Sequence, residues 1–194
     1  MKLKKALLIV DVQNDFCPGG SLAVPGADKI IPVLNKYLRI FLKKELPIFA
    51  SRDWHPVRTA HFRDFGGEWP VHCIQGTRGA SFHPGIKLPK EAILLYKGMD
   101  PSKESYSVFQ AEDEKGRPFL NILKVMGIGE LYIGGLATDY CVKFSVLDAL
   151  KQGFKVRLLM DAVKGVDINP NDSRKAVDKM LKSGARKTTL KDIT

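Results

Sequence analysis

Short apolar runs alternate with amphipathic segments along most of the chain, and this alternation restricts the fold more than any other feature. The apolar runs, where we expect strands, cover residues 6–10, 47–51, 92–96, 131–133, 155–160 and 186–190. The helical patterns between them cover 27–44, 118–126, 141–152 and 170–183. Strands that alternate with helices form parallel sheets with a helix layer on each face. The sequence therefore predicts an α/β fold with one doubly wound, mostly parallel, six-stranded sheet.

The length of 194 residues suits a single domain that spans residues 1–194. One segment, at about 54–89, interrupts the regular alternation. It contains all four histidines and both tryptophans, together with several glycines and prolines. A loop of this length inside a compact domain usually has a function. We therefore expect segment 54–89 to be an insertion that carries binding residues.

Charge and composition exclude several classes of function. The net charge is +10, but the lysines are spread over the chain and form no stripe with interleaved aromatic residues, so we expect no nucleic-acid partner. No apolar run approaches the ~20 residues of a membrane span, and we expect no membrane association. Three widely spaced cysteines without a signal peptide indicate a reducing cytoplasm. Whether the protein is a monomer or a homo-oligomer stays open.

Four chemically reactive side chains follow or lie near the ends of predicted strands. Asp11, Asp53 and Lys97 each follow a strand directly, and Cys141 follows the strand at 131–133 after a glycine-rich turn. Ligands of open parallel sheets bind at the carboxyl ends of the strands. We expect Cys141 in the first turn of a helix, where the helix dipole favours the nucleophilic thiolate. Asp11 can act as its base, with Lys97 as the neighbouring charge.

A second group of residues has the chemistry of a metal site. Asp53 and His55 are two residues apart, and His72 follows in the long loop. One carboxylate with two or three imidazoles is a common ligand set for zinc, iron or manganese, and zinc is our first choice. His61 is either a further ligand or a residue behind the ligands, and we expect His83 to lie on the surface.

Five motifs occur in order between Lys5 and about Asp161. They are DVQNDFCPGGSLAVPGAD, SRDWHP, WPVHC, the lysine of YKGMD, and GGLATDYCV. Together they resemble the nicotinamidase branch of the isochorismatase-like cysteine hydrolases. The first and last motifs are typical of the whole superfamily, whereas DWH and WPVHC are typical of this branch.

The resemblance implies a role for each matching residue. Asp11, Lys97 and Cys141 match the catalytic triad, and Asp53, His55 and His72 match the metal ligands, with His61 matching an extra histidine of some members. The Leu136–Ala137 peptide matches a cis bond, and the N–H groups of Ala137 and Cys141 match the oxyanion site. The residues that match or neighbour the wall of the substrate pocket are Phe16, Leu22, Trp69, Tyr106, Ala137 and Tyr140. The implied reaction converts nicotinamide to nicotinic acid and ammonia through a cysteine thioester, in NAD salvage.

Other interpretations of the same residues stay open. The chain could act on another small amide or on an isochorismate-like ether, as other members of the superfamily do. Alternatively, a metal-bound hydroxide could attack the substrate while Cys141 is only structural. A binding protein that kept the fold is a third alternative, which the intact set of Asp11, Lys97 and Cys141 disfavours. We expect Cys17, Cys73 and Asp161 to be structural.

Overall fold

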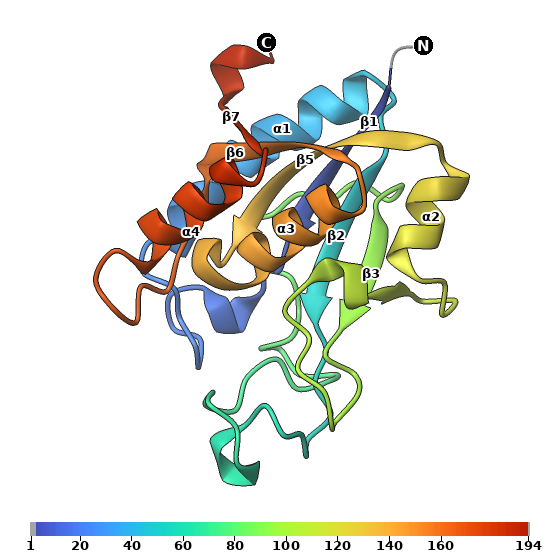
Figure 1. Ribbon diagram of the computed structural model, residues 1–194. Coiled ribbons are helices and arrows are strands. Elements are labelled where there is room, and N and C mark those ends of the chain that lie inside the picture. Colours follow the sequence, from blue (N-terminus) through green and yellow to red (C-terminus); the bar gives the residue numbers. More distant parts are fainter. Residues whose placement is uncertain (1–2, 194) are drawn as a thin grey trace.

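A seven-stranded sheet forms the centre of the computed structural model, which describes residues 3–193 (Figure 1). Its order is β4-β3-β2-β1-β5-β6-β7, and each strand is parallel to its neighbours except β4, which pairs antiparallel with β3. The strands are β1 (Lys4–Val10), β2 (Ile48–Asp53), β3 (Ile93–Lys97), β4 (Glu112–Asp113), β5 (Ile128–Leu136), β6 (Lys155–Lys164) and β7 (Arg186–Thr188). The α/β class and the mostly parallel sheet are confirmed. The predicted number of six strands is wrong, because the two-residue edge strand β4 is too short to give a periodic signal.

Helices cover both faces of the sheet. They are α1 (Ile31–Lys43), α2 (Phe119–Val125), α3 (Lys143–Lys151) and α4 (Asp172–Lys182). Figure 1 shows α1 behind the sheet and the other three in front of it. Two predicted helices begin later than expected. Residues 27–30 form a 3₁₀ turn before α1, and residues 138–142 form a π-helical turn before α3.

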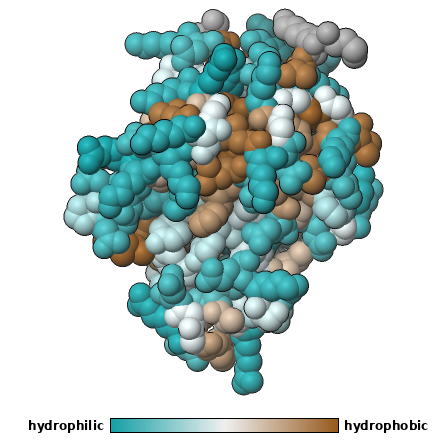
Figure 2. Space-filling model, viewed as in Figure 1, coloured by the Kyte–Doolittle hydropathy of each residue, from teal (hydrophilic) through white to brown (hydrophobic). Residues whose placement is uncertain are grey.

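Two apolar layers fill the space between the sheet and the helices. Successive side chains of β1 point to opposite faces, so Leu8 and Val10 pack in the layer under α2, α3 and α4, and Leu7 and Ile9 pack under α1. All four are fully buried, which explains why this strand is a continuous apolar run. Figure 2 shows hydrophilic side chains over the outer parts of one face of the molecule and apolar ones nearer its centre.

The strand order reverses between β1 and β5, because β2, β3 and β4 continue the sheet on one side and β6 and β7 on the other. Ligands of doubly wound sheets bind at the carboxyl edge beside such a reversal. Segment 54–89 extends from this edge, whereas both ends of the described chain lie on the opposite side (Figure 1). No helix within residues 3–193 is long and apolar enough to cross a membrane.

Candidate active site

Cys141 lies at the carboxyl edge of β5, within the π-helical turn Thr138–Val142. Its side chain is buried, and its Sγ is 3.4 Å from Nζ of Lys97. Burial raises the pKa of the Cys141 thiol well above its usual range, and Lys97 only partly opposes this effect. Cys141 was expected in the first turn of a helix; it lies in the π-helical turn that leads into α3, where burial opposes the thiolate form. A buried, protonated thiol needs a base before it can attack a substrate.

Asp11, the predicted base, directly follows β1. Its backbone is left-handed, with φ of 49°, and its N–H donates to the carbonyl of Ser51 at 3.1 Å. Oδ1 accepts a hydrogen bond from Ser51 Oγ at 2.7 Å, and Oδ2 lies 2.9 Å from Nζ of Lys97. Burial raises the pKa of Asp11 to about 6, against the opposing effect of Lys97. A carboxyl group with a pKa close to neutral is well suited to proton transfer.

Lys97, at the end of β3, joins the two groups of site residues. Its ammonium is fully buried and contacts Asp11, Asp53, the Ser105 carbonyl and Cys141. Burial alone would lower the pKa of Lys97, but the two carboxylates raise it well above its usual range. The side chain therefore carries a permanent positive charge between the predicted base, the predicted nucleophile and a predicted metal ligand.

Asp53, His55 and His72 converge as the sequence predicted. Ligand atoms of these three buried residues lie within 4.8 Å of one another. Asp53 ends β2, His55 follows two residues later, and His72 comes from the long loop. Burial would raise the pKa of Asp53, but Lys97 and His55 lower it, so this side chain is a carboxylate.

Both imidazoles are oriented by backbone carbonyls. Nδ1 of His55 lies 3.0 Å from the Gly98 oxygen, and Nδ1 of His72 lies 2.7 Å from the Pro70 oxygen. A carbonyl can only accept, so Nδ1 carries the proton and Nε2 keeps a free lone pair. Burial lowers the pKa of His55 to about 4 and also lowers the pKa of His72, which keeps both rings neutral. This is the tautomer in which histidine binds a metal.

His61 lies beside His55 and lines the same pocket as the trio. Its ring centroid is 4.7 Å from that of His55, and its Nε2 is buried without a hydrogen-bond partner among the described residues. An orphaned imidazole nitrogen beside a carboxylate and two oriented imidazoles fits a divalent transition metal. Its role as a ligand stays a prediction.

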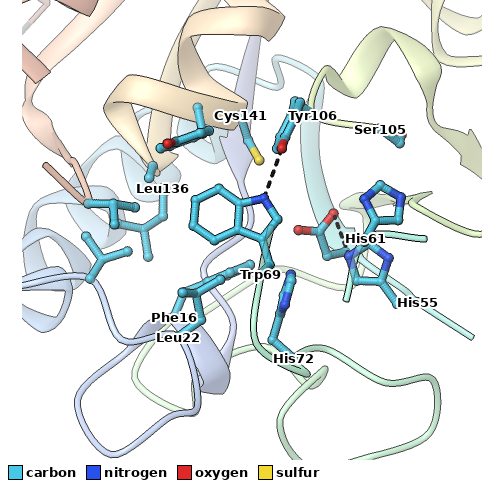
Figure 3. Close-up of a pocket in the computed structure, with 15 residues that line it drawn as sticks. Phe16, Leu22, His55, His61, Trp69, His72, Ser105, Tyr106, Leu136 and Cys141 are labelled. Atoms are coloured by element: carbon cyan, nitrogen blue, oxygen red, sulfur yellow. Dashed lines mark hydrogen bonds and ion pairs between the residues drawn. The ribbon is translucent and has the colours of Figure 1, made fainter. Parts of the chain in front are cut away.

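A pocket opens beside these residues and has an empty volume of about 500 Å³, including its mouth. All six residues predicted for the substrate wall line it: Phe16, Leu22, Trp69, Tyr106, Ala137 and Tyr140. Trp69 Nε1 donates to the Tyr106 hydroxyl at 2.9 Å, and the Tyr140 ring stands edge-on to Trp69. In Figure 3 the histidines gather on one side of Trp69, and Phe16 and Leu22 lie on the other. The sequence did not identify the further lining residues Val24, Ser105, Leu136 and Val166.

The Leu136–Ala137 peptide is cis, as the resemblance implied. Ala137 and Cys141 both line the pocket on this side. The role of their N–H groups in binding an oxyanion stays a prediction.

Three polar residues of the first motif hold the site together, and sequence reasoning assigned them no role. The Gln13 side-chain amide donates to the carbonyls of Asp53 and Ala80 at 2.8 and 3.0 Å, and its oxygen accepts from the Asp53 N–H at 2.8 Å. Asn14 donates to the Arg78 carbonyl, and Asp15 accepts from the Cys73 N–H, both at 2.7 Å. The run of polar residues directly after a buried strand was the available signal. These contacts fasten the long loop to the end of β1.

The residues expected to be structural lie as follows. Cys17 and Cys73 are buried free thiols, and burial raises the pKa of each. Asp161 accepts hydrogen bonds from the Tyr37 hydroxyl at 2.7 Å and the Leu190 N–H at 3.0 Å. His83 is half-buried and does not line the pocket, and its Nδ1 accepts a hydrogen bond from the Gly85 N–H at 3.0 Å.

Comparison with known proteins gives a consistent result. Residues 5–192 match the model of the isochorismatase domain. The Escherichia coli protein named nicotinamidase is 40% identical over 97% of this chain and 96% of its own length. The pyrazinamidase of Pyrococcus horikoshii, solved in complex with zinc, is 45% identical with a TM-score of 0.88, over 96% of this chain and 99% of that one. An L. infantum protein solved in complex with nicotinate is 30% identical with a TM-score of 0.85, over 98% of this chain and 95% of that one.

Proposed function

The chain belongs to the isochorismatase family, and we propose that it is a nicotinamidase that hydrolyses nicotinamide to nicotinic acid and ammonia. One observation carries this proposal. Lys97 contacts Asp11, Cys141 and Asp53 in one buried cluster, so a cysteine nucleophile with its base lies beside a metal-binding set at one pocket. The wall of that pocket is aromatic and apolar, which suits a small flat ring. The similarity to proteins named nicotinamidase supports the same substrate.

The first half of the proposed reaction forms a thioester. Asp11 takes the proton from the Cys141 thiol, and the sulfur attacks the carboxamide carbon of nicotinamide. The oxyanion that forms accepts hydrogen bonds from the N–H groups of Ala137 and Cys141. Asp11 then gives its proton to the nitrogen as the C–N bond breaks, and ammonia leaves. Throughout these steps Lys97 offsets the negative charge of the cluster.

The second half releases the product. Asp11 takes a proton from a water molecule, whose oxygen attacks the thioester carbon. The C–S bond then breaks, nicotinic acid forms, and Asp11 returns the proton to the Cys141 sulfur. The enzyme ends in its starting state, and the net change is addition of water across the amide bond.

We propose that Asp53, His55 and His72, with His61 as a possible fourth ligand, hold one divalent transition metal. Zinc is the first choice, because the P. horikoshii pyrazinamidase was solved with zinc and the donor set suits it. Iron and manganese remain alternatives. When bound, the metal would take the pyridine nitrogen and so orient the ring. We place the protein in the cytoplasm as a monomer or homo-oligomer, with the small amide as its partner and without nucleic acid.

The test is ammonia release from nicotinamide by the purified wild type, by Cys141→Ala, and by a chelated sample. We expect release by the wild type, loss in the variant and a decrease after chelation. Release that survives the Cys141→Ala substitution would replace this mechanism with attack by a metal-bound hydroxide. No release from nicotinamide, with zinc present and thiols reduced, would point to another small amide.

A further inference from the structure

Asp139 is a buried carboxylate two residues before Cys141, and the reaction described above does not use it. Its side chain points toward the connection between β6 and α4 and not toward the proposed reacting groups. Oδ1 accepts a hydrogen bond from the N–H of Val166 at 2.9 Å, and Oδ2 accepts one from the N–H of Asp167 at 2.7 Å. Asp139 is 3% exposed, so both bonds are shielded from water. Hydrogen bonds from backbone N–H groups to a shielded carboxylate are among the strong ones.

The segment that Asp139 holds contributes a wall of the substrate pocket. Val166 lines the pocket together with Leu136, Tyr140 and Cys141. On its other side, Val166 borders a second, open hollow lined by Met160, Val163 and residues of α4. Val166 packs against the apolar layer under α1 on one side only, because the hollow lies on its other side. The hydrogen bonds to Asp139 supply a further restraint on its position.

Two further features fit this arrangement. A Cβ atom at Gly165 would lie 1.8 Å from Ser173 Oγ and 2.9 Å from Asp139 Oδ1, so only glycine permits the close approach. Asp167, whose φ is 51°, accepts hydrogen bonds from the N–H and the hydroxyl of Ser173, both at 2.7 Å. The segment is thus fastened to the nucleophile turn at one end and to α4 at the other.

We propose that Asp139 is a positioning residue that holds Val166 against the substrate ring and so determines which ring-substituted amides fit the pocket. The proposal rests on the proposed function, because it concerns the pocket in which nicotinamide would bind. Asp139 links the turn that carries the nucleophile to the wall that contacts the ring. Loss of this link would widen the pocket without removing any reacting group.

The experiment compares Asp139→Asn with Val166→Ala and with Asp172→Asn as the matched control. Asp172 also accepts hydrogen bonds from a backbone N–H of this connection, that of Asn169, but it is outside the pocket. For each protein, kcat and KM are measured with nicotinamide and with nicotinamides that carry one ring methyl group. Hydrogen exchange of the Val166 and Asp167 amides and alkylation of Cys141 by iodoacetamide are measured in parallel.

We expect Asp139→Asn to lose exchange protection at the amide that faces the new NH₂ group and to lower it at the other, because the remaining oxygen is neutral and a weaker acceptor. KM for nicotinamide should rise about tenfold with a small change in kcat, and discrimination against the methylated amides should fall about tenfold. Val166→Ala should have the same substrate pattern, and the double variant should be no worse than either single one. Asp172→Asn should behave as the wild type, and alkylation of Cys141 should be unchanged throughout.

Several results would overturn the proposal. One is that Asp139→Asn has the same kinetic constants and the same exchange protection as Asp172→Asn. Another is that kcat of Asp139→Asn falls equally for every amide and that Cys141 is alkylated more slowly. If Asp139→Asn does not fold, Val166→Pro removes one of the two hydrogen bonds from the donor side, since proline has no N–H. An unchanged substrate pattern in Val166→Pro would equally overturn the proposal. If the wild type releases no ammonia from nicotinamide, the proposed function fails, while the exchange measurement still decides whether Asp139 holds the segment.

Discussion

The site draws on two regions that are built in different ways. Asp11, Asp53 and Lys97 end neighbouring strands, and the parallel ladder from β1 to β3 fixes their spacing directly. His61 and His72 come from segment 54–89, which contains a single 3₁₀ turn and isolated bridges but no strand of the sheet. That segment is held by side-chain hydrogen bonds from Gln13, Asn14 and Asp15. The predicted acid–base residues, Asp11 and Lys97, thus lie on the rigid part of the fold. The predicted metal ligands are divided between a strand end, which carries Asp53, and a loop that must be fastened to the sheet.

The substitution Cys141→Ala should reduce activity most, because it removes the proposed nucleophile and does not change segment 54–89. Cys141→Ala should lower kcat/KM by about 10⁴-fold, since no other thiol lines the pocket among the described residues. Zinc content, measured by atomic absorption, should stay that of the wild type. Cys17→Ala serves as the control, because Cys17 is a buried thiol outside the pocket lining, and it should keep most of the activity. If Cys141→Ala keeps its activity, Cys141 is not the nucleophile.

Removal of Lys97 should affect the predicted triad and the predicted metal-ligand group together. Lys97→Met leaves the buried carboxylates of Asp11 and Asp53 without their shared cation. We expect a loss of about 3–5 kcal/mol in the free energy of unfolding, measured by urea denaturation, together with loss of activity. The control is Lys103→Met, which removes an exposed ion pair with Asp100 and should change stability little. If Lys97→Met and Lys103→Met have the same free energy of unfolding, Lys97 does not stabilise the buried carboxylates of Asp11 and Asp53.

A change at Gly98 should weaken the metal site and spare the nucleophile. A Cβ atom at Gly98 would lie 2.4 Å from Cε1 and 2.7 Å from Nδ1 of His55. Gly98→Ala should therefore displace the ring and lower zinc affinity by about 10–100-fold, measured by competition with a chelator. Gly116→Ala is a matched control, because Gly116 has the same φ of 72° but nothing within 4 Å of the added atom. If both variants bind zinc equally well, contact with the His55 ring is not what positions the ligand.

The smallest effect concerns the pH dependence of the base. Asp11 acts as a carboxylate, so kcat/KM should rise with pH through a midpoint at about 6, the raised pKa of its buried side chain. The Ser51 hydrogen bond stabilises the charged form and lowers this pKa, so Ser51→Ala should move the midpoint to higher pH. Ser51→Thr keeps the hydroxyl and should restore the wild-type profile. A midpoint that is the same in all three proteins would exclude Asp11 as the group that titrates.

The same difference between strand ends and loop determines which site residues could be predicted from the sequence. Asp11, Asp53 and Lys97 were predictable because a strand end determines which sheet edge a residue reaches. The convergence of His55 with His72 rested on ligand chemistry and on resemblance, since no periodic pattern connects positions 17 residues apart in a loop. The polar run after β1 marked Gln13, but its partners could not be predicted, because contacts between a side chain and a distant backbone leave no periodic trace. Val166 was missed because no pattern connects it with the rest of the pocket wall. The π-helical turn at Cys141 was missed because its apolar spacing resembles that of an ordinary helix.

Both ends of the described chain lie on the side of the sheet away from segment 54–89 (Figure 1). His55, His61 and His72 of that segment line the pocket. A surface linker or a fused reporter joined at either end would therefore leave the pocket mouth facing solution. The protein could be fixed in one orientation on an ammonia-sensing electrode, with every molecule presenting its open side to the sample.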